Sequence, residues 1–335
     1  VKTARSIPRN YLNLSPELLL SGVTPLINEL KTSDPVNAHS VFHSIEDLYS
    51  KELNPNAIHH ELLHKVLQFA PSNVEAASEY AQILAHEGKW DDGLSLLQPI
   101  EATLGSSEGA RLLGQVYVQR GQFDSAYVLL SAYTATRLHS MQAAEKRFMD
   151  LRNTLWDSEF KRLNSGKGPK TFYDGYDLTP ENDKQAYVDA YVVESIRKSA
   201  SYKEAMEDYR ASTQIVPVAM DLGFATLKRA ESMSDAAARN DEMSKAEQTF
   251  LSIRSVAGDS DEYMMYLGQV YYWLGKQEEG YQLLNELLDK YNRSPDALLN
   301  VAFTLRNIGF GSEATKLAEE SVSYTHLTLP TKRIV

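Results

Sequence analysis

The sequence predicts an all-α protein in which antiparallel helix hairpins stack side by side. Proline and glycine are sparse, at 12 and 17 of 335 residues, and alternating β-branched runs are nearly absent. Apolar residues recur instead at helical spacing along most of the chain, which predicts helices of about 12–18 residues joined by short turns. With 43% apolar residues, the chain is too apolar to stay disordered. Its length suits two ordinary domains or one elongated array.

Several segments carry the signals of a helix start. In Ser15-Pro16-Glu17 and Thr179-Pro180-Glu181, a capping hydroxyl precedes a proline suited to the first helical position and an acid suited to the first turn. Asp34-Pro35 and Asn54-Pro55 have a similar pattern. These segments are therefore expected to begin helices.

An internal repeat favours one elongated array over two ordinary domains. Each copy has two small residues 12 positions apart, and Ala81 and Gly114 set a period of 33 while Gly268 and Ala302 set one of 34. The pairs are Ala81/Gly93, Gly114/Ala126, Gly268/Gly280, Ala302/Ala314 and, in a fifth copy, Val193/Ala205.

The spacing of these small pairs predicts a helix hairpin. Small residues that face each other let the two helix axes approach closely. In four of the five copies, a glycine between the members of the pair is expected to end the first helix in the left-handed conformation, and these glycines are Gly88, Gly121, Gly275 and Gly309. One hairpin cannot bury its own apolar face, so the hairpins must stack.

The repeat resembles the tetratricopeptide repeat (TPR) family. The matching residues are Leu113-Gly114, Leu267-Gly268, Tyr117, Tyr271, Ala126, Ala205, Ala314, Pro71 and Pro217. The resemblance covers roughly half of the chain. It implies a TPR-like α-solenoid, a right-handed superhelix whose first helices line a concave face that binds partners.

The period slips twice, which predicts two repeat blocks. Residues 1–136 hold N-terminal helices and a first block with repeats at 74–106 and 107–136. A long amphipathic helix and a polar loop at 137–180 interrupt the period. The second block, 181–322, contains repeats at 186–217, 218–256, 261–294 and 295–322. The second of these carries an insertion that is expected to extend its first helix or lengthen its turn.

The resemblance places a partner-binding groove on the first helices. The residues that flank the buried stripe are mostly aromatic or amide-bearing, with one methionine and two arginines, and such a mixture favours binding of a protein or peptide. They are Met265, Tyr266, Gln269, Tyr272, Trp273, Asn300, Phe303, Arg306, Tyr191 and Arg197. The alternative for Tyr272 and Trp273 is packing against a neighbouring hairpin.

One string has the spacing of a metal site. His60-Glu61-Leu62-Leu63-His64 places two imidazoles one helical turn apart and resembles the signature of zincin metallopeptidases. No third histidine follows at the expected spacing, and the repeats begin near Val74, leaving no room for the rest of such a domain. A surface helix is therefore favoured over a zinc site at His60 and His64.

No catalytic constellation is evident in the sequence. The chain has no cysteine and no Gly-x-Ser-x-Gly string. The loop Gly166–Thr171 lacks the phosphate-loop pattern, and Pro169 removes a donor from it. We therefore expect a non-enzymatic scaffold or adaptor without a cofactor. The alternative is the TPR portion of a larger enzyme, a peptidase or transferase, whose catalytic domain lies outside this chain.

Charge and chain ends bear on partner and compartment. The net charge of −11 argues against nucleic acid, whose binding requires cations that neutralise phosphates. Apolar runs are too short to span a bilayer, so a soluble chain of the cytoplasm or periplasm is expected, its oligomeric state open. Val1 suggests a missing upstream segment such as a signal peptide. The array is expected to end near Val322, and residues 323–335 resemble translated adapter sequence.

Overall fold

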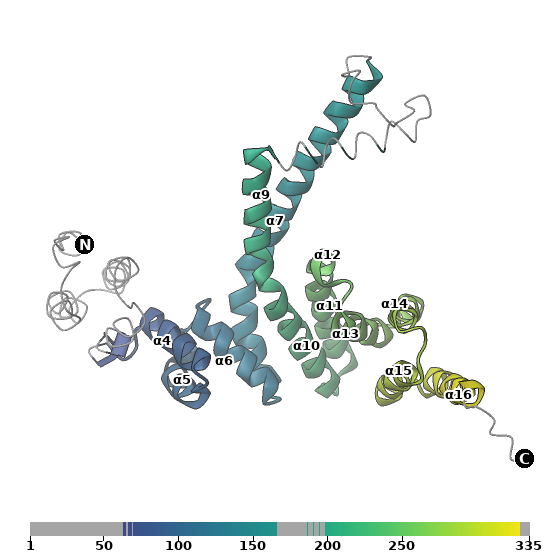
Figure 1. Ribbon diagram of the computed structural model, residues 1–335. Helices are drawn as coiled ribbons and strands as arrows, with labels where there is room; N and C mark the ends of the chain where they lie inside the picture. Colours follow the sequence, from purple (N-terminus) through teal and green to yellow (C-terminus); the bar gives the residue numbers. More distant parts are fainter. Residues whose placement is uncertain are drawn as a thin grey trace, which may run out of the picture. The chain divides into compact units, whose positions relative to one another are not determined.

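The computed structural model describes residues 70–165 and 198–328, together with residues 63, 64, 66–68, 186, 190 and 194. Every regular element within these residues is a helix (Figure 1), which confirms the all-α prediction. Successive helices pair as antiparallel hairpins that stack as in a TPR-like α-solenoid. The chain divides into two compact units, Val1–Tyr133 and Thr134–Val335, which are described separately.

The described part of the first unit contains the repeats that begin at residues 74 and 107. Its helices are α4 (Val74–His86), α5 (Trp90–Leu97), the 3₁₀ helix η3 (Gln98–Thr103), α6 (Glu108–Gln119) and the start of α7, at Phe123. The Asn73 side chain accepts a hydrogen bond from the backbone N–H of Ala76 (2.8 Å) and so caps α4. A Cβ atom added to Gly93 would lie 3.2 Å from the carbonyl oxygen of Ala81, so this small pair does meet.

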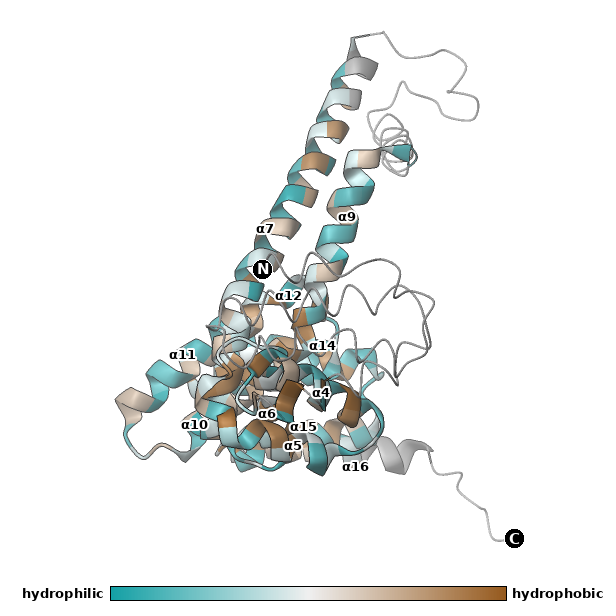
Figure 2. Cartoon of the chain, turned by 90° about the vertical axis from the view of Figure 1, so that its left-hand side faces the viewer, coloured by the Kyte–Doolittle hydropathy of each residue, from teal (hydrophilic) through white to brown (hydrophobic). Residues whose placement is uncertain are grey.

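Helix α7 joins two helices that the sequence suggested were separate. It runs from Phe123 to Asn164, 42 residues, so the second helix of the 107–136 repeat continues without a break into the expected interruption at 137–180. No glycine or proline occurs between these two residues, so nothing in the chain stops the helix. Apolar and polar residues both occur along its length in Figure 2, as an amphipathic helix requires.

The second unit begins with the later part of α7, which lies beside α9 (Ala200–Ser212; Figure 1). The Phe148 ring lies 4.9 Å from the Tyr202 ring and 5.7 Å from the Tyr209 ring, measured between centroids. An ion pair between Arg147 and Asp208 lies on the same side. These contacts give the amphipathic face of α7 its partner.

The next hairpin accounts for the second slip in the period. The 3₁₀ helix η5 (Thr213–Ile215) leads into α10 (Val216–Ser232), which pairs with α11 (Ala236–Ser252), and both α-helices have 17 residues. The corresponding helices of the following hairpin have 13 and 14 residues. The insertion therefore lengthens both helices by about a turn, and only Met233, Ser234 and Asp235 connect them.

Two regular hairpins complete the second unit. After the short α12 (Arg254–Ala257) come α13 (Asp261–Trp273), α14 (Gln277–Lys290), α15 (Pro295–Asn307) and α16 (Gly311–Thr328). The hydroxyls of Ser260 and Ser294 cap α13 and α15. The backbone of α16 stays helical to Thr328, so the expected end near Val322 is wrong by one to two turns, and residues 329–335 lie outside the described part.

The four turn glycines have the conformation that the repeat predicts. Their φ angles are +79° at Gly88, +71° at Gly121, +75° at Gly275 and +96° at Gly309. In each case the next backbone N–H reaches back to the first helix, as in the 2.9 Å bond from Lys276 N to the Tyr271 carbonyl oxygen. The left-handed residue is therefore part of the hairpin geometry.

Replacing Gly275 by alanine should lower the free energy of unfolding by about 1–2 kcal/mol, because a Cβ atom disfavours the left-handed conformation. No atom lies within 4 Å of the Cβ position, so the cost is conformational and not steric. Urea denaturation followed by circular dichroism measures it. Gly311→Ala is the control, because Gly311 also has open space but no positive φ. Equal stability of the two variants would contradict the explanation.

Candidate functional site

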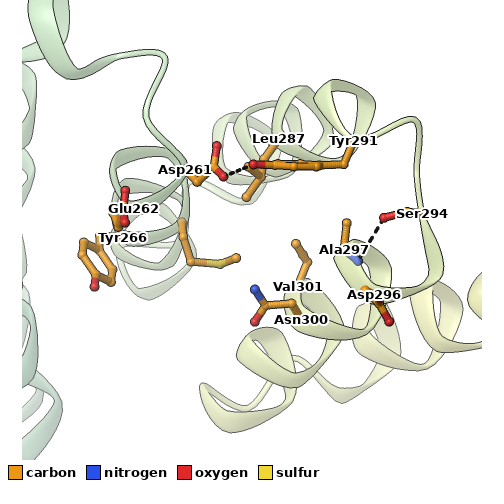
Figure 3. A pocket seen from close by; sticks show the side chains of 11 residues that line it. Asp261, Glu262, Tyr266, Leu287, Tyr291, Ser294, Asp296, Ala297, Asn300 and Val301 are labelled. Carbon is orange, nitrogen blue, oxygen red and sulfur yellow. Dashed lines mark hydrogen bonds between the residues drawn. The ribbon is translucent and has the colours of Figure 1, made fainter.

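A cavity of about 580 Å³ lies between the first helices of the last two described hairpins. We call it the α13/α15 pocket. Figure 3 shows side chains from α13, α14 and α15 around it. Its lining residues are Asp261, Glu262, Met265, Tyr266, Leu287, Tyr291, Ser294, Asp296, Ala297, Asn300 and Val301.

The pocket brings together part of the groove expected from the sequence. Met265 and Tyr266 project from α13, and Asn300 from α15, one hairpin further on. The Tyr266 ring lies 4.8 Å from the Phe224 ring of α10, so its position is fixed by packing on the preceding hairpin. Asn300 is exposed, which leaves its amide available to a ligand.

Carboxylates dominate the polar part of the pocket. Asp261 accepts hydrogen bonds from Lys290 Nζ (2.7 Å) and from the Tyr291 hydroxyl, and the Lys290 bond in particular lowers the pKa of Asp261. Burial raises the pKa of Tyr266, and the negative charge of Glu262 raises it further. Asp296 adds another exposed carboxylate on α15. The pocket therefore combines apolar walls with a negative rim.

Two expected groove residues are buried instead. Tyr272 is 3% exposed and Gln269 is 7% exposed. The Tyr272 ring meets the Phe310 ring of the next hairpin at 4.7 Å, and the Gln269 amide donates to the Met265 carbonyl oxygen (3.2 Å). The prediction that these two side chains contact a partner is wrong, because the next hairpin covers this side of α13.

Trp273 also packs against a neighbouring hairpin, on the other side. Its indole Nε1 donates to Glu231 Oε1 of α10 at 3.3 Å, and the Arg239 guanidinium carbon of α11 lies 5.2 Å from the ring centroid. The side chain is half-buried. Trp273 therefore joins adjacent hairpins and does not line the α13/α15 pocket.

Phe303 and Arg306 line a second cavity, of about 660 Å³, between α15 and α16. Leu299 also lines it, and so does Asn300, which therefore borders both cavities. Phe303 is 65% exposed and Leu299 is 48% exposed. Phe303 stands 34 positions after Gln269, one repeat later, so the two residues occupy equivalent positions on α15 and α13. The side of the helix that is covered on α13 is therefore uncovered on α15, among the described residues.

Some predicted site residues cannot be placed. Tyr191, Arg197 and His60 lie outside the described residues. His64 is exposed and pairs with the Gln68 amide at 3.3 Å between nitrogens. Within the part of the chain that the structure describes, no group of three or more possible ligands can hold a metal ion. In the same part, no helix has the length and apolar character needed to cross a membrane.

Sequence reasoning missed the contribution of the second helix to the pocket. Leu287 lies on α14 and Tyr291 is the residue that caps its C-terminus, and both line the space between α13 and α15. Two of the acids, Glu262 and Asp296, were recognisable from their place at the start of a first helix. Leu287 and Tyr291 follow the turn of the same hairpin, and only the hairpin geometry shows that they reach this face.

The similar proteins found for this chain are solved structures. No model of a known protein family matches the chain, and no curated protein matches it. Among solved structures, a monomeric mutant of IFIT1 with Gppp-AAAA is 14% identical, with 96% of this chain and 74% of that chain covered and a TM-score of 0.22. The human IFIT1 dimer with m7Gppp-AAAA is 13% identical, with 96% and 75% covered and a TM-score of 0.23.

A third similar structure is the human IFIT1 dimer with PPP-AAAA. It is 13% identical, with 92% of this chain and 69% of that chain covered and a TM-score of 0.24. These three TM-scores are too low to show that this chain and IFIT1 superimpose. The TPR-like character of this chain therefore rests on its own helix hairpins.

The exclusion of nucleic acid as a partner is corrected by the same structures. They contain IFIT1 with Gppp-AAAA, m7Gppp-AAAA or PPP-AAAA. The exclusion rested on a net charge of −11, which averages over all 335 residues. A ligand meets the local charge of its own site, so the net charge does not justify that prediction.

Proposed function

We propose that this chain is a non-enzymatic helical-repeat scaffold that binds an extended segment of a protein partner in the α13/α15 pocket. The observation that carries the proposal is the cavity itself. It lies between first helices of consecutive hairpins, the face that the TPR resemblance assigns to partners. No catalytic step is part of the proposal.

The composition of the pocket supports a protein segment as the ligand. Met265, Leu287 and Val301 provide an apolar wall, on which an aliphatic or aromatic side chain can be buried. The exposed Asn300 amide offers a donor and an acceptor to a backbone peptide group. Binding sites for extended segments combine these two features, which supply affinity and register respectively.

The test begins with peptides selected from a display library against the purified chain, with binding measured by fluorescence anisotropy. Asn300→Ala should weaken a pocket-bound peptide about fivefold, because truncation of a central contact costs about 1 kcal/mol. Tyr281→Ala is the matched control, since Tyr281 is 56% exposed on α14 and does not line the pocket. Circular dichroism of each variant verifies folding.

A single-stranded oligonucleotide with a 5′-triphosphate is measured in the same assay. Asn300 also lines the α15/α16 cavity, so Phe303→Ala, a change in that cavity alone, is measured as well. Peptides that lose affinity with Asn300→Ala and keep it with Tyr281→Ala and Phe303→Ala support the proposal. It is overturned if Asn300→Ala leaves all selected peptides unaffected. It is also overturned if no peptide is selected while the oligonucleotide binds and loses affinity with Asn300→Ala.

A further inference from the structure

The TPR-like repeat places a carboxylate at one position of four first helices. It stands six residues before the small residue of the pair and lies in the first helical turn. The four residues are Glu75, Glu108, Glu262 and Asp296. A first-turn acid interacts favourably with the helix dipole, so its recurrence alone has a structural explanation. The surroundings of the carboxylate in α6 differ from those in α13 and α15.

In α6 the carboxylate is neutralised by its own helix. Arg111, three residues after Glu108, donates from Nε to Glu108 Oε2 at 2.6 Å. The corresponding positions hold Met265 in α13 and Leu299 in α15. Among the described residues, no cation forms an ion pair with Glu262 or Asp296. The position three residues after the acid therefore holds an arginine in α6 and an apolar side chain in α13 and α15.

Both acids border the α13/α15 pocket and its apolar wall. The third acid there, Asp261, is already compensated by Lys290 at 2.7 Å. Two negative charges thus remain next to Met265, Leu287 and Val301. A lysine or arginine side chain matches this surface, because its methylene stem covers apolar groups while its charged end stays near carboxylates and water.

We propose that the bound segment inserts a lysine or arginine into the α13/α15 pocket, where its cation is held between Glu262 and Asp296; this rests on the proposed function. The cation takes the role that Arg111 has beside Glu108 in α6. The charge pair selects the segment more than it adds affinity, since both carboxylates are exposed.

Neutralising the two acids tests the proposal. The double variant Glu262→Gln/Asp296→Asn should weaken a selected peptide roughly tenfold at low salt, and raising the salt concentration should shrink this difference. Glu278→Gln is the control, because Glu278 is an exposed first-turn acid of α14 outside the pocket. Replacing the peptide's lysine or arginine by glutamine should cause the same loss of affinity for the unchanged chain. Combining this peptide with the double variant should not weaken binding any further.

A second variant supplies the cation within the chain. Met265→Arg reproduces the α6 arrangement, with a guanidinium three residues after the acid, and should compete with the basic side chain of the peptide. Met265→Gln is the matched control, since it removes the same apolar contact without adding charge. Met265→Arg is expected to bind the peptide severalfold more weakly than Met265→Gln does.

The outcomes separate this inference from the proposed function. Suppose a peptide loses affinity with Asn300→Ala, while the double neutralisation and the peptide's own Lys→Gln change each alter affinity less than twofold. Peptide binding in the pocket then stands and the cation site is overturned. Peptides that are insensitive to Asn300→Ala overturn both.

Discussion

Replacing Phe250 by alanine should lower the free energy of unfolding of the second unit by about 3–5 kcal/mol, the range for removing a large aromatic core side chain. Phe250 lies on α11 and is 0% exposed. Its ring meets the Tyr263 ring edge-on at 6.1 Å and lies 6.3 Å from the Tyr266 ring. Urea denaturation followed by circular dichroism gives the difference from the unchanged chain.

Phe303→Ala is the matched control for this prediction, since Phe303 is 65% exposed and its loss should cost less than about 0.5 kcal/mol. Gly223 offers a second check. A Cβ atom there would lie 2.6 Å from the Phe250 ring, so Gly223→Ala should be destabilising alone and much less so combined with Phe250→Ala. Additive effects of these two changes would show that the ring does not occupy this space.

Replacing Glu242 by alanine should cost about 3 kcal/mol, the second large effect expected in this unit. Glu242 is 5% exposed on α11, and its Oε1 accepts from Arg229 Nη1 of α10 at 2.5 Å. Its Oε2 accepts from Lys245 Nζ at 3.0 Å. Removing the carboxylate takes a charge partner away from the guanidinium of Arg229, whose side chain is only 19% exposed. The same denaturation experiment measures the loss.

Asp241→Ala is the control for Glu242→Ala. Asp241 also pairs with Lys245, at 2.9 Å, but its side chain is 70% exposed, so its loss should cost 1 kcal/mol or less, about the value of a surface ion pair. The double variant Arg229→Met/Glu242→Leu should recover most of the stability, because an apolar pair carries no desolvation penalty. If Glu242→Ala and Asp241→Ala cost the same, burial does not govern this ion pair.

The hairpins could be predicted from the sequence because each carries its own local signals for helix contacts and helix ends. The small pair Ala81/Gly93 and the turn glycines Gly88 and Gly275 mark helix contacts and helix ends that depend only on local chemistry. Helix α7 is the counterexample. A long helix after residue 136 was expected, but not its unbroken connection to the helix that begins at Phe123. The connection follows from the lack of a stop signal, which a search for repeats overlooks because the period ends there.

The pocket could be predicted only in part. Met265, Tyr266 and Asn300 were recognised as part of a groove, but Gln269 and Tyr272 on the same helix are covered by the next hairpin. A helix inside a solenoid is buried on two sides, against its hairpin partner and against the neighbouring hairpin. The hydrophobic periodicity of the sequence reveals the side that packs on the hairpin partner. The side that packs on the neighbouring hairpin depends on how consecutive hairpins are rotated relative to each other.

The position of the pocket between adjacent hairpins has a consequence for folding cooperativity. In a stacked array, stability is approximately the sum of the intrinsic terms of the hairpins and a coupling term for each pair of neighbours. The pocket takes residues from α13–α14 and from α15, so a ligand there touches both members of one pair. Its binding free energy is added to their coupling term. Occupancy would thus make α13–α14 and α15–α16 unfold together as one cooperative block.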